Sequence, residues 1–223
     1  MDKVSEKKEF SVVVVDDQSL FREGLTKLIH NWPRAGKISE AEGGLELLQI
    51  LESSAWDIIL LDLLMPSMDG LETLRQIRQL YPEQKVMILT QIEDETVLKE
   101  IIGLGISGFI LKNIHFAELT KALDMVADGF EYFTSDITRI LYKSISVRGE
   151  VQKKTIHLND REIEVLKCSC MQMSVEETAA KLFLSASSVK KYKMSLLEKT
   201  GSKNSVGLFR FALEQGIVSL NDL

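Results

Sequence analysis

Three aspartates directly follow apolar runs of the sequence. Asp16 and Asp17 come after the run 10–15, and Asp62 comes after the run 58–61. The second run is apolar at every position, which predicts a strand in the middle of a sheet that helices cover on both faces. Each aspartate is therefore expected at the carboxyl end of a buried strand, where open α/β sheets bind their ligands.

Two further polar side chains occupy the same kind of position. Thr90 follows the apolar run 85–89, and Lys112 follows the predicted strand 105–111. Three carboxylates at one edge of a sheet repel one another unless a cation joins them, and Mg²⁺ is a hard cation that prefers oxygen ligands. Asp62 could then attack phosphorus, while magnesium and Lys112 supply positive charge and the Thr90 hydroxyl binds a phosphoryl oxygen. The chemistry predicted for this edge is phosphoryl transfer.

The elements that must position these residues alternate between strand and helix. Apolar residues at helical spacing separate the apolar runs. This alternation predicts an α/β fold with a doubly wound, five-stranded parallel sheet, as in flavodoxin-like proteins. Strands are expected at 10–15, 37–42, 58–61, 85–89 and 105–111, and helices at 20–29, 45–51, 71–80, 94–104 and 116–126.

The remainder of the chain is predicted to contain only helices. A short helix is expected at 135–142, an interdomain linker at 144–156, and further helices at 160–171, 175–182, 186–200 and 205–215, with Gly201 and Gly216 as stops. These patterns predict three parts. They are an α/β domain over 1–128, a short helix and linker over 129–156, and a small all-α helix-turn-helix domain over 157–223.

Charge and composition differ between the two predicted domains. Residues 1–149 hold 16 lysines and arginines against 24 acidic residues, whereas residues 150–223 hold 11 against 9. An acidic domain suits a cation or a protein partner, and a basic domain suits a polyanion. The chain is 45% hydrophobic, with no apolar run long enough to span a bilayer, which predicts a globular cytoplasmic protein without a membrane partner. Cys168 and Cys170 are expected to be reduced and buried, without a disulfide or a metal.

The predicted helix 186–200 carries lysines on a side that has no apolar neighbour to cover. At about 100° per residue, this side holds Ser187, Lys190, Lys191, Met194 and Ser195, whereas Val189, Lys193 and Leu196 lie opposite. The helix follows another helix across a brief turn, which is the pattern of a helix-turn-helix whose second helix enters the major groove of DNA. For this helix by itself, a solvated lysine face is the alternative.

The acidic residues and their neighbours resemble the receiver domain of two-component response regulators, over residues 9–128. The motifs are the pair DD after the first strand, D-x-x-M-P-x-M-D-G at 62–70, Thr90, and F-I-L-K at 109–112. The resemblance implies that Asp62 is the phosphoacceptor and that Asp17, Asp62 and the backbone carbonyl of Leu64 bind magnesium, with Asp16 assisting through water. It also implies a switch pair, Thr90 and Phe109, in which the hydroxyl moves toward the phosphoryl group and the ring turns inward.

The C-terminal motifs resemble the four-helix DNA-binding domain of LuxR/NarL-type transcription regulators, over residues 157–217. The motifs are L-N-D-R-E-x-E-V-L at 158–166, S-x-x-E-T-A at 174–179, L-F-L-S-x-S-S-V-K-K-Y at 182–192 and K-T-G at 199–201. By this resemblance, Lys190, Lys191 and Met194 contact bases on the side that also carries Ser187. Phosphate contacts are expected from Lys181, Tyr192, Lys199 and Lys203. Tyr192 stands where histidine is usual, Gln172 where glycine is usual, and Ser205 and Gly207 where arginine and glutamate are common. The missing arginine removes a phosphate contact or a helix-capping ion pair, so the DNA site is expected to be unusual or its binding weaker.

Together the two resemblances imply a response regulator, with no enzyme activity beyond the phosphorylation and dephosphorylation of its own receiver. A sensor histidine kinase would phosphorylate Asp62 with magnesium as the cofactor. Phosphorylation would promote a homodimer that binds paired half-sites in double-stranded DNA. The expected dimer seams are the last helix, around Phe209 and Leu213, and the first or fifth helix of the receiver. RNA polymerase is a further candidate partner.

Two other functions fit parts of the sequence. A DNA-binding regulator with a vestigial receiver would need no phosphorylation, but the complete set of polar residues at the sheet edge argues against it. A haloacid-dehalogenase-like phosphatase also uses an aspartate nucleophile with a lysine and a hydroxyl. That family places its nucleophile in a D-x-D pattern after the first strand, whereas the first strand here ends in D-D-Q.

Overall fold

The structure is a computed structural model of the chain, and it describes residues 8–66, 69–91, 94–113, 115–134, 137, 156–171, 173–202 and 205–218. The chain divides into two compact units, Met1–Gly129 and Phe130–Leu223. Over the residues described, no helix combines the length and the apolar character needed to cross a membrane.

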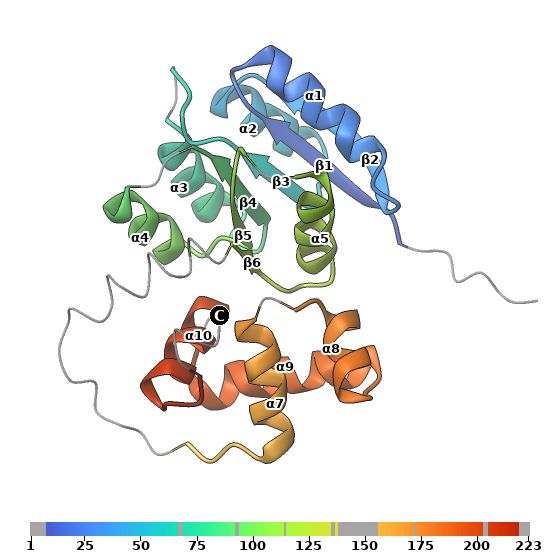
Figure 1. The fold of residues 1–223 in the computed structure, drawn as a ribbon. Coiled ribbons are helices and arrows are strands. Elements are labelled where there is room, and N and C mark those ends of the chain that lie inside the picture. The colour runs from blue at the N-terminus through green and yellow to red at the C-terminus, as the bar shows by residue number, and fades with distance from the viewer. Residues whose placement is uncertain are drawn as a thin grey trace, which may run out of the picture. The chain divides into compact units, whose positions relative to one another are not determined.

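Six strands form one sheet in the order β2-β1-β3-β4-β5-β6 (Figure 1). From β2 to β5, neighbouring strands pair in parallel. The central strand β3 is buried at all four positions because helices cover both faces of the sheet, as its uniformly apolar sequence predicts. The strands are β1 (Phe10–Val15), β2 (Ala35–Ala41), β3 (Ile58–Leu61), β4 (Lys85–Thr90), β5 (Gly108–Leu111) and β6 (Tyr132–Phe133).

The register of the sheet aligns the carboxyl ends of its central strands. Val15 at the end of β1 pairs with Leu61 at the end of β3. Thr90 at the end of β4 pairs with Leu111 at the end of β5. The polar residues that follow these strand ends therefore meet at one edge of the sheet.

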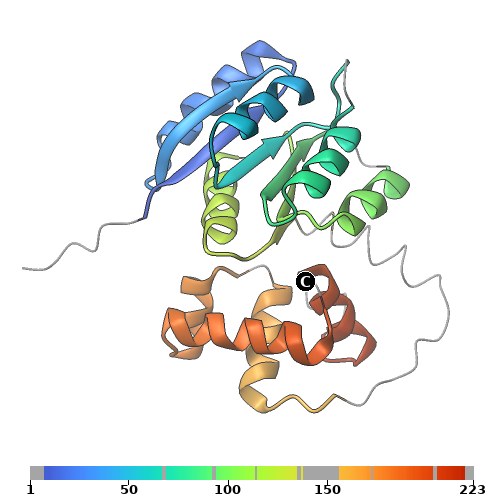
Figure 2. The ribbon, with the colours of Figure 1, turned by 180° about the vertical axis from the view of Figure 1, so that it is seen from behind.

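Five helices cover the sheet. Helices α1 and α5 lie on one face, and α2, α3 and α4 lie on the other (Figures 1 and 2). Each packs an apolar stripe inward, as Leu25 and Ile29 do in α1. Helix α3 begins at Gly70 because the Asp69 side chain caps it by accepting a hydrogen bond from the Leu71 N–H. The helices are α1 (Ser19–His30), α2 (Gly44–Ser53), α3 (Gly70–Leu80), α4 (Glu95–Gly103) and α5 (Phe116–Ala127).

The described part of the second unit includes the four helices α7 to α10. Helices α7 and α8 each begin with a capping box, formed by Asn159 with Glu162 and by Ser174 with Glu177. Helix α9 ends at Gly201, whose left-handed φ of 66° favours glycine. The helices are α7 (Asp160–Cys170), α8 (Val175–Leu182), α9 (Ala186–Thr200) and α10 (Ser205–Glu214). Their apolar faces share one core, which includes Val165, Leu166, Leu196, Leu208 and Ala212.

The predicted elements differ from the observed ones chiefly in the number of strands and in the start of β5. The prediction of five strands is one short, because β6 has only two residues and so shows no periodicity. Strand β5 begins at Gly108, three residues later than predicted, because Gly105 still belongs to the turn after α4, where its φ is 81°. The predicted helix 135–142 and the linker 144–156 fall largely outside the described residues. Both cysteines are free and buried, as predicted.

Candidate acidic site and basic helix

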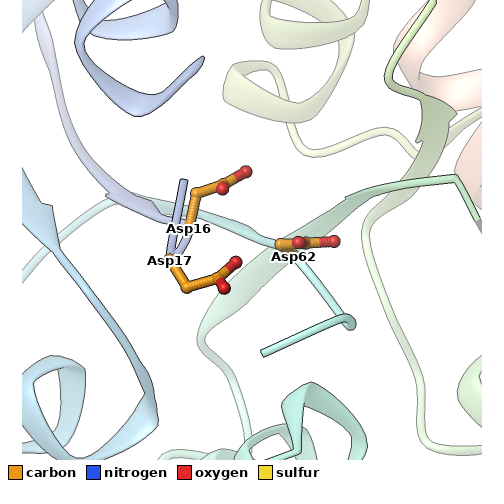
Figure 3. A group of neighbouring side chains, drawn as sticks. All are labelled: Asp16, Asp17 and Asp62. Carbon is orange, nitrogen blue, oxygen red and sulfur yellow. The ribbon is translucent and has the colours of Figure 1, made fainter. Parts of the chain in front are cut away.

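Three carboxylates gather at the carboxyl edge of the sheet. Figure 3 shows Asp16 and Asp17 side by side after β1, next to Asp62 after β3. One oxygen from each carboxylate lies within 4.8 Å of the others. Asp16 and Asp62 are buried, whereas Asp17 is exposed. The strand ends thus bring together three acidic groups that lie up to 46 positions apart in the sequence.

Lys112 provides the positive charge among these acidic groups. Its Nζ lies 2.7 Å from Asp16 Oδ2 and 2.8 Å from Asp62 Oδ2. Burial by itself would lower the pKa of Lys112, but hydrogen bonds to the two carboxylates raise the pKa above its ordinary value. The ammonium group therefore stays charged at neutral pH.

The two oxygens of Asp62 have different surroundings. Oδ2 accepts a hydrogen bond from Lys112, whereas the buried Oδ1 has no hydrogen-bond partner among the described residues. Leaving a buried acceptor unpaired costs about 1–3 kcal/mol, so this oxygen marks a position for a ligand. The donor set of carboxylate oxygens, one of them unpaired and one exposed, fits a hard divalent cation such as Mg²⁺.

The other residues predicted for this site lie close by in the fold. Thr90 is fully buried at the last position of β4. Its register partner Leu111 immediately precedes Lys112. Phe109 on β5 has no exposed surface, so its ring already lies inside the domain. Leu64, two residues after Asp62, is half exposed beside the cluster.

Two residues near this edge shape the site in ways that the sequence did not predict. A Cβ atom on Gly70 would lie 2.3 Å from the backbone oxygen of Asp62, so only glycine fits where α3 meets the end of β3. Arg22 on α1 is buried and donates a hydrogen bond to the backbone carbonyl of Asp16. A glycine after an aspartate indicates only a turn, and an arginine in an amphipathic helix usually lies at the surface.

Helix α9 of the second unit has the two sides that its periodicity predicts. Val189 and Leu196 are fully buried on one side. On the other side, Ser187 and Lys191 are exposed, and Met194 keeps 61% of its surface exposed. Lys190 is half buried between these sides.

Lys193 lies on the buried side of α9, with 5% of its surface exposed. Burial lowers its pKa to about 8. Its Nζ lies 4.6 Å from the centre of the Phe130 ring, at a distance that permits a cation–π contact. A buried lysine with a depressed pKa indicates a charge whose folding cost is incompletely compensated.

Lys199 pairs with a buried carboxylate of its own unit. Its Nζ lies 2.6 Å and 2.9 Å from the two oxygens of Glu162, and the Ser195 hydroxyl donates to the same carboxylate. The hydrogen bond from Lys199 lowers the pKa of Glu162 below its ordinary value. The charge of Lys199 is therefore shared with Glu162, the same residue that closes the capping box of α7.

The remaining residues of the predicted DNA surface have different surroundings. Lys181 is exposed at the end of α8. Tyr192 packs partly against the core of the unit. Lys203 lies outside the described residues. Phe209, expected at a dimer seam, is only 4% exposed within this same core, so that part of the prediction is wrong for Phe209. The amphipathic pattern of a helix does not distinguish a core from a seam.

Two family models match the chain, one over each unit. A model of the response regulator receiver domain matches residues 12–124. A model of bacterial regulatory proteins of the luxR family matches residues 156–212. The acidic site lies within the first match, and the basic helix α9 lies within the second.

Similar proteins match over nearly their whole length. The transcriptional regulatory protein YdfI of Bacillus subtilis is 30% identical, with 95% of this chain and 99% of that protein covered. DegU of Brevibacillus brevis is 29% identical, with 89% of this chain and 90% of that protein covered. A solved structure of the response regulator RcsB from Salmonella typhimurium has a TM-score of 0.58 at 25% identity, covering 92% of this chain and 99% of that one.

A receiver with an acidic edge, joined to a helix-turn-helix domain, defines a transcription regulator of the two-component class. This chain belongs to the response regulators that carry a LuxR-type DNA-binding domain, and it is a transcription factor of that family. The phosphatase and the phosphorylation-independent regulator are accordingly not favoured.

Proposed function

We propose that Asp62 accepts a phosphoryl group from a sensor histidine kinase in a magnesium-dependent reaction that controls DNA binding by the second unit. The observation that carries this proposal is that the two carboxylate oxygens of Asp62 differ in their hydrogen-bond partners. One is paired with Lys112, and the other is buried beside Asp16 and Asp17 with no partner in the described part of the chain. A buried acidic group with an open oxygen is costly unless a ligand uses it.

The residues of the site have separate roles in this reaction. A carboxylate oxygen of Asp62 forms a bond to phosphorus as the bond from phosphorus to the kinase histidine breaks, and the electron pair of that bond returns to the imidazole. Lys112 holds the Asp62 carboxylate and carries the positive charge that the transferred group needs. Asp17, Asp62 and the backbone carbonyl of Leu64 would hold the magnesium ion, and Asp16 would assist through water. The ion, when bound, shields the negative charge of the phosphoryl group.

Thr90 and Phe109 form the proposed switch. They lie on neighbouring strands, with Phe109 paired in register with Ile88, two residues before Thr90. The Thr90 hydroxyl would hydrogen-bond a phosphoryl oxygen. This movement of Thr90 would change the space that is available to the Phe109 ring. The Phe109 side chain is fully buried, and in this proposal an inward ring belongs to the phosphorylated form.

The second unit would bind double-stranded DNA through the exposed side of α9. We assign base contacts to Lys190, Lys191 and Met194, since a lysine can donate to guanine and a methionine can pack against a thymine methyl group. Ser187 lies near the start of the same exposed side. Phosphate contacts are assigned to Lys181, Tyr192, Lys199 and Lys203. Among them, Lys199 could bind a phosphate only by sharing its ammonium group with Glu162.

Homodimers would form on activation. An apolar cavity of about 600 Å³ between α1 and α5 supports a receiver seam there, and Leu20 beside it keeps 86% of its surface exposed. The structures of RcsB include dimers bound to DNA, which supports the same arrangement for this relative. RNA polymerase would be a further partner. As a regulator of transcription that acts on the chromosome, the protein would work in the cytoplasm.

The proposed domains follow the roles of these residues. Residues 1–128 would act as the receiver and residues 157–223 as the DNA-binding domain. The segment 129–156 would connect them. The family matches at 12–124 and 156–212 support this division.

A gel-shift titration of the full chain on promoter DNA tests the proposed control. Magnesium with beryllium fluoride, which mimics a phosphoryl group, should tighten DNA binding and raise the oligomeric state of the wild-type chain. Asp62→Asn should abolish both responses, because the substitution removes the anionic oxygen that receives the phosphoryl group. Equal affinity and equal oligomeric state with and without the mimic would contradict the proposal.

A further inference from the structure

Arg22 of α1 is a buried arginine whose three side-chain nitrogens each donate a hydrogen bond to residues at the ends of β1 and β2. It keeps only 6% of its surface exposed. Nη1 donates to the backbone carbonyl of Asp16 at 2.5 Å. Nε donates to Glu40 at 3.1 Å, and Nη2 donates to Glu42 at 3.2 Å. A buried guanidinium with this many partners is held in one orientation.

The hydrogen bond from Arg22 completes the fixation of Asp16. The Asp16 N–H donates to the Ala41 carbonyl at 3.1 Å. The side chain of Asp16 accepts from the Gln18 N–H and pairs with Lys112. With the carbonyl held by Arg22 as well, every polar group of Asp16 has a partner.

This fixation determines where Asp17 lies. The carbonyl that Arg22 holds belongs to the peptide plane that joins Asp16 to Asp17, and this plane includes the Asp17 Cα, from which the side chain leaves the backbone. Asp17 is exposed, and no hydrogen bond to its carboxylate occurs among the described residues. Its position therefore depends on the main chain that Arg22 holds.

The charge of Arg22 is neutralised by its own partners. Glu40 and Glu42 both pair with the guanidinium, so little net positive charge remains to offset the three aspartates. Lys112 already supplies that charge by direct contact with Asp16 and Asp62. An effect of Arg22 on the site would therefore come from geometry and not from charge.

We infer that Arg22 is a positioning residue for the magnesium site, because it fixes the peptide between Asp16 and Asp17 and thereby places the Asp17 carboxylate opposite Asp62. This inference rests on the proposed function, in which those carboxylates hold the metal ion. It assigns a role to a residue outside the acidic cluster, on the helix that follows β1.

Magnesium titrations of the full chain by calorimetry test the role of Arg22 without any phosphoryl transfer. Arg22→Lys keeps the charge but cannot reach the carbonyl and both glutamates at once, and Arg22→Gln removes the charge as well. Both variants should bind Mg²⁺ about tenfold or more weakly, which is the usual loss when a group that orients a metal ligand is removed. At saturating Mg²⁺, the rate of phosphorylation by acetyl phosphate should return most of the way to that of the wild-type chain.

Arg34→Gln is the matched control. Arg34 is also a largely buried arginine with two acidic partners, but these are Asp124 and Asp128 of the α5 region. Its loss should lower stability and leave the affinity for Mg²⁺ unchanged. Thermal unfolding checks that each variant is folded, and if Arg22→Gln is not, Arg22→Lys carries the test.

Three outcomes are distinguishable. Weaker Mg²⁺ binding in the Arg22 variants alone supports the inference. Wild-type affinity in Arg22→Lys, or equal losses in the Arg22 and Arg34 variants, overturns it. A third result separates the two proposals. If the Arg22 variants bind Mg²⁺ more weakly but the wild-type chain accepts no phosphoryl group, the proposed function is contradicted and the positioning role remains.

Discussion

Asp62 and Lys193 are both buried, but their partners differ. Asp62 is paired with Lys112 at 2.8 Å. Lys193 faces the ring of Phe130, and its pKa falls to about 8. A paired charge can serve a binding site, whereas an incompletely compensated one lowers stability.

Lys193→Met should therefore stabilise the unit Phe130–Leu223. In the folded protein Lys193 loses its proton near pH 8, whereas in the unfolded chain it does so near its ordinary value of 10.5. Below pH 8 the folded wild type bears the full cost of burying the charge. The free energy of unfolding should therefore be about 1–3 kcal/mol higher for the variant than for the wild type at pH 7. The difference should shrink as the pH rises from 8 toward 10.5, because the folded wild type then holds a neutral lysine and deprotonating the unfolded chain costs less free energy at higher pH.

Urea unfolding followed by NMR methyl signals from α7 to α10 measures this effect separately from the first unit. Lys191→Met is the control, since Lys191 is exposed on the same helix and should change the free energy of unfolding by less than about 0.5 kcal/mol. A gain for Lys193→Met that persists undiminished at pH 10 would mean that packing, and not charge burial, is responsible.

At the scale of elements, the close approach of α3 to the end of β3 shapes the acidic site. The Gly70 N–H donates to the Leu63 carbonyl at 3.2 Å. A Cβ atom at Gly70 would lie 2.3 Å from the backbone oxygen of Asp62 and 2.5 Å from the Leu63 Cα. Both contacts involve backbone atoms, so neither can be relieved by rotating a side chain.

Gly70→Ala should therefore displace α3 from the end of β3. We expect the free energy of unfolding of the first unit to fall by about 1–3 kcal/mol, as for other overpacked positions. Phosphorylation of Asp62 by acetyl phosphate should slow in parallel, because Asp62 lies on the backbone that must move. Chemical denaturation followed by tryptophan fluorescence measures the first effect, since Trp32 and Trp56 are both in this unit.

Gly24→Ala is the matched control for this substitution. Gly24 lies inside α1, where a Cβ atom would meet nothing within 4 Å. Alanine there should raise stability by up to about 1 kcal/mol, because it favours the helix. An equal change in the free energy of unfolding for the two variants would show that α3 does not pack tightly against the end of β3.

At the scale of the whole molecule, the two units have separate cores. The aspartates that fit a metal ion all belong to Met1–Gly129. The core around Leu166 and Leu196 belongs to Phe130–Leu223. A ligand of the first unit should therefore stabilise that unit directly and the second only through any coupling between them.

Magnesium at 100 times its dissociation constant should raise the unfolding free energy of the first unit by about 2.7 kcal/mol. The second unit should not respond to the ion alone. Urea-dependent hydrogen exchange of the full chain reports both units in one sample, and Asp17→Asn should remove most of the response. Equal stabilisation of both units would indicate that the chain unfolds as a single cooperative body.

The sequence by itself determined the order of the elements and the position of the candidate site. Strand and helix periodicities are local, so the alternation up to residue 126 and the four C-terminal helices could be predicted from them. The polar residues after the strands could be predicted to share one edge, since parallel strands align their carboxyl ends. Element bounds and the two-residue strand β6 were less predictable, because short segments carry little periodicity.

Only the tertiary structure decided which partner each polar group has. It distinguishes the two oxygens of Asp62, joins Lys199 to Glu162, and brings Arg22 to the Asp16 carbonyl. The last two contacts join residues on different helices or loops, and their distances depend on how those elements pack. Helical periodicity shows which side of an element faces inward, but the atom that a buried charge meets there depends on the packing of the whole unit.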